Sequence, residues 1–152
     1  MRPLKAMLVI VIMVFFTWVS VSTVNAGTYI GDFCWRWEIS AEGGTETGII
    51  RVAVTDMGNG HYFLNGKIIE EDEPSIQATH GNAEIAGDKV YMTLNTTEAD
   101  HEEMCAYTIY VVLNWPSLNG TFESIGLCYK YDSQVIVKDY VGPETATFIT
   151  CP

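Results

Sequence analysis

The chain has 152 residues, of which 19 are Asp or Glu and eight are Lys or Arg, so its formal net charge is −11. Nucleic acids and anionic membrane surfaces are bound mainly through basic side chains, so this charge predicts neither of them as a partner. The same charge favours solubility, and it favours cationic partners over anionic ones.

Residues 1–26 have the features of a targeting segment. Arg2 and Lys5 precede an unbroken apolar run over residues 8–16, and Ala26 provides a small residue at the expected cleavage position. We predict a cleaved signal peptide here.

Residues 27–152 are then expected to form a single exported domain, either periplasmic or secreted. A membrane anchor is the rival interpretation, but polar residues from Thr17 onward interrupt the apolar stretch and no charged stop follows. No later apolar run reaches the roughly 18 residues that a membrane helix requires, so we expect no stable membrane insertion after cleavage.

The first half of this domain reads as strands separated by turns. Phe33, Trp35 and Trp37 alternate with polar residues, which is the period-two pattern of a strand with one solvated face. Further strand-like runs cover residues 49–55, 61–69, 75–85 and 89–97. The first two of these runs are separated by Gly58-Asn59-Gly60 and the last two by Gly87-Asp88, which are hairpin signals.

Two β-rich runs, residues 104–113 and 120–130, flank a turn marked by Pro116. An antiparallel hairpin centred on this turn places Cys105 directly opposite Cys128. Directly opposed Cβ atoms lie roughly 4.5–5.5 Å apart, which is close to the roughly 3.5–4.5 Å of a disulfide. The spacing therefore predicts the hairpin, its register and a Cys105–Cys128 bridge together.

The remaining cysteines, Cys34 and Cys151, lie in the first and last strand-like segments. Four cysteines allow three pairings, and a bridge within the hairpin leaves these two to join the ends of the domain. Free buried thiols are the alternative, which an oxidising compartment disfavours. Residues 134–137 and 145–149 provide one or two closing strands, with Gly142-Pro143 between them.

No convincing amphipathic helix occurs between residues 27 and 152. Sequential strands usually neighbour one another, so the simplest arrangement is an antiparallel meander of about eight strands. Closure into a small up-and-down barrel removes the exposed edges of such a sheet. We therefore predict an all-β barrel, with a two-sheet β-sandwich as the alternative.

The order of these elements resembles the calycin group, which includes the lipocalin- and avidin-type barrels. The segment Gly31-Asp-Phe-Cys-Trp35 lies where lipocalins carry Gly-x-Trp, although Phe33 occupies the Trp position. Leu64-Asn-Gly66 and Leu118-Asn-Gly-Thr-Phe122 are similar to strand openings of avidin-like barrels. The resemblance spans the whole domain as a pattern. It implies an interior able to hold a ligand, and it transfers no binding residue.

Aromatic side chains are the candidates for lining such an interior. A small eight-stranded barrel either fills its interior with side chains or holds one small ligand, so a filled core competes with a pocket. The candidate pocket residues are Phe33, Trp35, Trp37, Tyr62 and Tyr107. The expected partner is a small apolar ligand, and no cofactor is predicted.

Metal and catalytic motifs are absent from the sequence. His61, His80 and His101 are its only histidines, and no His-x-x-x-His, Cys-x-x-Cys or Gly-x-Ser-x-Gly spacing occurs. The acidic stretch 70–73 matches no EF-hand pattern and indicates a loop, and residues 100–103, which could offer zinc ligands, are interpreted as a solvated acidic loop. We predict neither a metal site nor a catalytic residue.

Three functions remain open. The first is a binding module for a small apolar or amphipathic ligand. The second is a structural or interaction protein with a filled core, which presents its acidic surface to a cationic partner. The third, and the least supported, is a metal-dependent hydrolase that uses His80, His101 and nearby carboxylates.

Overall fold

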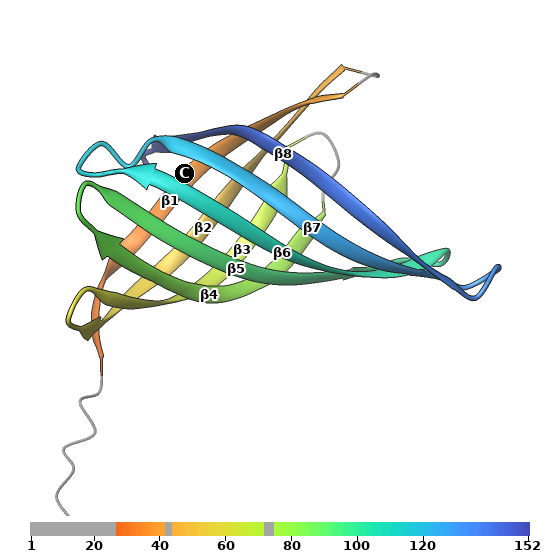
Figure 1. Cartoon of the computed structure of the whole chain (residues 1–152), viewed down its shortest axis with the longest axis horizontal. Helices are drawn as coiled ribbons and strands as arrows, with labels where there is room; N and C mark the ends of the chain where they lie inside the picture. Colours follow the sequence, from red (N-terminus) through yellow and green to blue (C-terminus); the bar gives the residue numbers. More distant parts are fainter. Residues whose placement is uncertain (1–26, 42–43, 72–74) are drawn as a thin grey trace, which may run out of the picture.

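The computed structural model describes residues 27–41, 44–71 and 75–152, which form an antiparallel meander closed into a barrel (Figure 1). The predicted all-β barrel is confirmed, and the two-sheet sandwich is not formed. The predicted signal peptide lies outside the described residues. The eight strands are β1 (Thr28–Ala41), β2 (Gly44–Gly58), β3 (His61–Glu70), β4 (Ile76–Ala86), β5 (Lys89–Ala99), β6 (Glu103–Asn114), β7 (Gly120–Lys130) and β8 (Val135–Ile149).

Alternation of inward- and outward-facing side chains builds most of the core. In β5, Val90, Met92 and Leu94 are buried, whereas Tyr91 is half exposed on the outer face. Successive side chains of a strand point to opposite faces of the sheet, so the period-two pattern of the sequence becomes a pattern of burial. Trp35 and Trp37 obey the same rule in β1 and belong to the core. In the described part of the chain, no helix is long and apolar enough to cross a membrane.

The two ends of the barrel carry different turns. The turns that join β2 to β3, β4 to β5 and β6 to β7 lie at one end, together with the start of β1 (left in Figure 1). We call this the near end and the opposite end the far end. The hairpin predicted at residues 58–60 is present at the near end: Gly58 pairs with His61, and the two turn residues between them, Asn59 and Gly60, both have positive φ.

The hairpin of β6 and β7 has the predicted register. Cys105 lies opposite Cys128 and Tyr107 lies opposite Gly126, and the two cysteines form a disulfide. The register follows from the turn, because the position of the turn fixes which residues face each other across two antiparallel strands.

The closing strand β8 continues through Gly142 and Pro143 as a single strand. The sequence allowed either one or two strands in this segment. The pairing of β7 with β8 shifts between Phe122 and Ser124, so Glu123 faces an extra residue of β8. Such a bulge accommodates the proline, which cannot donate a backbone hydrogen bond to a neighbouring strand. Gly142 adopts a φ of 115° there, a conformation that other residues rarely adopt.

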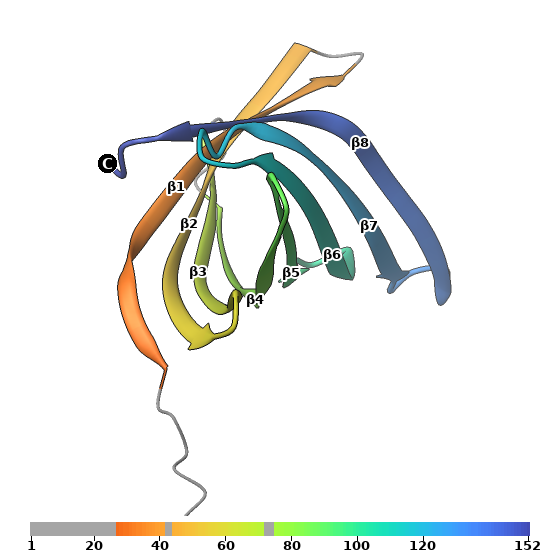
Figure 2. The same ribbon diagram turned by 60° about the vertical axis from the view of Figure 1, so that its left-hand side comes forward.

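The barrel closes through a short seam between β1 and β8. Cys34 to Glu38 pair with Ile149 to Thr145, and a disulfide joins Cys34, at one end of this seam, to Cys151, just after β8. The first half of β8 pairs with β7 alone, and Figure 2 shows it diverging from β1 toward the far end. The second predicted bridge is therefore present, and it holds the closure of the barrel.

Glycines on the inner face let the strands approach and bend. A Cβ on Gly66 would overlap the carbonyl oxygen of Arg51, and a Cβ on Gly81 would overlap that of Thr93. Glycine in a strand commonly marks a bend or a close backbone approach. These two positions therefore require glycine for packing.

Replacing Gly66 with alanine is expected to lower the free energy of unfolding by about 1–3 kcal/mol or more, because the added methyl group overpacks the strand contact. Gly87→Asn is the control, since Gly87 has open space around it and a φ of 64°, which asparagine tolerates. Urea unfolding measures both. Equal stability of the two variants would contradict the close approach at Gly66.

Candidate functional site

The interior of the barrel has a filled middle and a cavity at each end. Val52, Leu94 and Val111 are at most 1% exposed and line neither cavity, so they form the packed layer between them. The near-end cavity has a volume of about 200 Å³ and the far-end cavity about 180 Å³. The sequence allowed either a filled core or a pocket. The filled core describes the middle of the barrel, and the pocket describes its two ends.

The structure divides the five predicted pocket residues between these cavities. Phe33, Trp35 and Tyr62 line the near-end cavity. Trp37 and Tyr107 line the far-end cavity. The five therefore do not form one site, although all of them border an interior space.

The near-end cavity is almost entirely apolar. In the part of the chain that the structure describes, no Asp, Glu, Lys, Arg or His lines it, and the aliphatic part of its lining comes mainly from β2 to β6. Phe33 and Trp35 stack with ring centroids 6.3 Å apart, and Phe148 packs against both rings. The aliphatic lining escaped the sequence prediction, which considered aromatic residues only: Ile30, Val54, Leu64, Ala83, Ile85, Val90, Met92, Leu113 and Leu118.

The loop between β6 and β7 forms one lip of this cavity. The indole nitrogen of Trp35 donates a hydrogen bond to the carbonyl oxygen of Leu118 at 2.8 Å. The backbone nitrogen of Trp115 donates to the carbonyl oxygen of Asp88 in the β4–β5 turn, also at 2.8 Å. Trp115 and Leu118 both line the cavity, and Trp115 remains half exposed at the rim. The β6–β7 loop is therefore held in place by Trp35 from the barrel interior and by the neighbouring β4–β5 turn.

The far-end cavity has an aromatic wall. Trp37 and Phe122 meet edge to face with ring centroids 6.2 Å apart, and Tyr107 lies on the neighbouring strand β6. Trp37 covers Gly48 and Tyr107 covers Gly126, the glycine that each faces across the strand pair. A Cβ at either glycine would collide with the ring, so glycine makes room for both aromatic side chains.

The environment of Tyr107 is both buried and negative. Burial is the main cause that raises the pKa of Tyr107 to about 12, and the carboxylates of Asp139, Glu98, Glu103 and Glu70 add to the rise. A folded-state pKa above the ordinary value of 10.0 means that the folded protein keeps this proton where the unfolded chain loses it.

Raising the pH from 10 to 12 is therefore expected to destabilise the fold, and Tyr107→Phe should reduce that loss of stability. The measurement is the free energy of unfolding in urea at the two pH values. Tyr91→Phe, on the outer face, is the control and should keep the pH dependence of the wild type. If the Tyr107→Phe protein lost as much stability between pH 10 and 12 as the wild type, Tyr107 would not be the cause of that loss.

The histidines do not converge on one site. His80 is exposed on the outer face of β4 opposite Asn95, whereas His101 lies in the turn after β5. His61 lies 3.9 Å from Glu84, at the near end. Within the described ranges, none of these histidines belongs to a group of three or more ligand side chains close enough to hold a metal ion.

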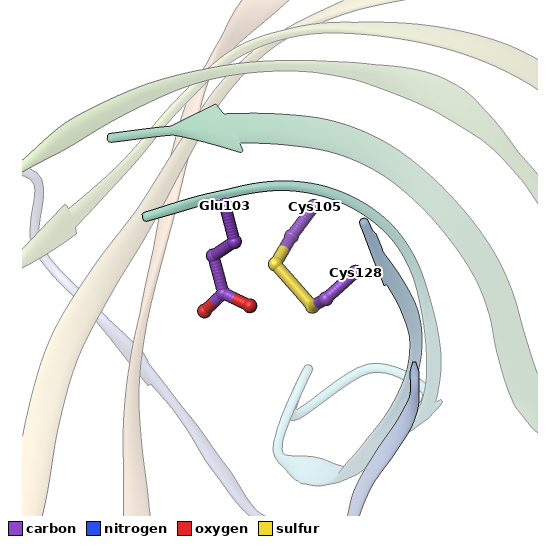
Figure 3. A group of neighbouring side chains, drawn as sticks. All are labelled: Glu103, Cys105 and Cys128. Carbon is purple, nitrogen blue, oxygen red and sulfur yellow. A yellow bond between two sulfur atoms is a disulfide. The ribbon is translucent and has the colours of Figure 1, made fainter. Parts of the chain in front are cut away.

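One group of possible ligand atoms does occur in the described part of the chain: Glu103, Cys105 and Cys128 (Figure 3). The two sulfur atoms are bonded to each other, and a metal ligand requires a thiolate. Glu103 also forms an ion pair with Lys130. In this oxidised state the group is a disulfide beside a paired carboxylate.

The acidic stretch 70–73 is only partly described, because residues 72–74 lie outside the described residues. Glu71 forms an ion pair with Arg36 at 3.1 Å, and it also accepts a hydrogen bond from Thr47. Glu70 accepts a hydrogen bond from Gln77 and borders the far-end cavity. The described part of this stretch is therefore held to neighbouring strands.

No family model matches the sequence, and the comparisons with curated proteins and with solved structures also return no match.

Proposed function

We propose that this protein binds a small apolar ligand, or the apolar part of an amphipathic one, in the near-end cavity. The observation that carries the proposal is a cavity of about 200 Å³ at the mouth of the barrel, lined by apolar and aromatic side chains. An apolar cavity of about 150 Å³ engineered into another protein holds a benzene molecule. The near-end cavity therefore has room for a ligand the size of one ring.

Selection in this cavity would depend on shape and apolar area. The indole N–H of Trp35, a polar group directed to the interior, already donates to Leu118 and is occupied. No charged side chain of the described residues lines the cavity, so an ionised group would lose its hydration without gaining a partner among them. Each buried methylene contributes about 0.8 kcal/mol, so affinity should rise with the apolar size of the ligand until the cavity is full.

The same proposal includes export and a calycin-type assignment. Two disulfides are typical of proteins that fold in an oxidising compartment, which agrees with the signal peptide predicted for residues 1–26. An eight-stranded up-and-down barrel with a cavity at its mouth agrees with the calycin resemblance of the sequence.

A calorimetric titration that uses toluene, a neutral molecule with a single aromatic ring, as the apolar probe tests the proposal. The folded protein should bind the probe saturably, and Ala83→Leu should weaken binding at least tenfold by filling the cavity, in which Ala83 is an inward-facing wall residue. Ala78→Leu is the matched control, because Ala78 lies on the same strand but is exposed on the outer face. We expect it to bind the probe like the wild type.

Two results would overturn the proposal. One is a folded wild-type protein that does not bind the probe or any other member of a panel of small apolar compounds. The other is equal probe affinity in the Ala83→Leu and Ala78→Leu proteins, which would place the probe outside the near-end cavity.

A further inference from the structure

The far-end cavity differs from the near-end cavity in charge. Among the described residues, four carboxylates line it, Glu46, Glu70, Glu98 and Asp139, and no lysine or arginine does. Each comes from a different strand: β2, β3, β5 and β8 respectively. Glu70 and Glu98 are half-buried in the wall, whereas Glu46 and Asp139 are exposed at the rim. The described lining of the near-end cavity, by contrast, contains no carboxylate.

The negative charge of these carboxylates is felt inside the cavity. Asp139, Glu98 and Glu70 all contribute to the raised pKa of Tyr107, whose ring forms part of the cavity wall. The position of Glu70 is also fixed, because Gln77 donates to its Oε1 at 3.2 Å and Thr96 in turn lies within hydrogen-bonding distance of the Gln77 oxygen. A negative potential therefore reaches a cavity that is walled by aromatic rings.

We propose that the far-end cavity is a second binding site, which takes a small organic cation: a protonated amine or quaternary ammonium group on an apolar body. Aromatic rings attract such cations through their negative faces, and Trp37, Tyr107 and Phe122 provide three rings. The carboxylates add long-range attraction for the same charge. The cavity volume of about 180 Å³ suits a compact ligand.

The arrangement disfavours the other classes of ligand. An anion would be repelled by these carboxylates, and a neutral apolar molecule would gain nothing from their charge. A bare metal ion requires ligand atoms that converge closely. Among the described residues, these four carboxylates do not include three whose oxygen atoms lie within 4.8 Å of one another. The carboxylates are thus spread around a space, which fits a bulky cation.

Isothermal titration calorimetry with benzyltrimethylammonium tests this site. The wild-type protein should bind the cation saturably and more weakly as the salt concentration rises, because salt screens the carboxylates. The uncharged molecule of the same shape, neopentylbenzene, should bind the far-end cavity at least tenfold more weakly. This comparison is made in the Ala83→Leu protein, in which the near-end cavity is filled.

The double variant Glu70→Gln/Asp139→Asn should bind the cation at least tenfold more weakly than the wild type. The matched control is Glu84→Gln/Glu123→Gln, which removes two carboxylates from residues outside the cavity lining and should bind like the wild type. Circular dichroism and cooperative unfolding in urea establish that each variant is folded. If the double variant does not fold, Asp139→Asn alone replaces it, because Asp139 is exposed at the rim, and a threefold or larger loss is then expected.

The proposal is overturned if the folded wild-type protein does not bind the cation, or if the cavity and control variants bind it equally. It is also overturned if Ala83→Leu abolishes cation binding, because the cation would then occupy the near-end cavity. Failure of the apolar probe to bind the wild type leaves this site unaffected, so the two proposals fail separately.

Discussion

The barrel depends on the pairing of β1 with β8. This seam extends only from Cys34 to Glu38 on β1, and it aligns Trp35 with Phe148 and Trp37 with Ala146. The two tryptophans line different cavities, Trp35 at the near end and Trp37 at the far end. One short run of strand pairing therefore closes the sheet and positions an aromatic wall for both interior spaces.

Covalent and polar contacts hold this seam. The Cys34–Cys151 bridge spans 117 residues of chain, and closing so long a loop is worth roughly 4–5 kcal/mol in the chain-entropy model. Arg51, which faces Cys34 from β2, donates to the carbonyl oxygen of Pro152 at 3.3 Å and forms an ion pair with Asp32 at 2.7 Å. The segment that follows β8 is thus tied to both β1 and β2.

Much of this fold follows from local rules that the sequence displays. Period-two alternation predicts which side chains point inward, and the break at Pro116 predicts the register that brings Cys105 opposite Cys128. The partition of the pocket residues between two cavities does not follow from those rules. Alternation gives the side of the sheet, whereas the height of a residue along the barrel depends on how the strands are staggered when the sheet closes. The continuous β8 was also hard to foresee, because its bulge depends on the partner strand that absorbs Gly142 and Pro143.

The most direct measurement of the closure is backbone amide hydrogen exchange, resolved by residue, in the oxidised protein and in Cys34→Ala/Cys151→Ala. If the seam closes the barrel, the amides of residues 34–38 and 145–149 that face the opposite strand are protected like those of β5 in the oxidised protein. Removing the bridge should then accelerate exchange at the seam before it does so in β5. Seam amides that exchange as fast as those of the exposed turns in the oxidised protein would contradict a closed barrel, and with it both cavities.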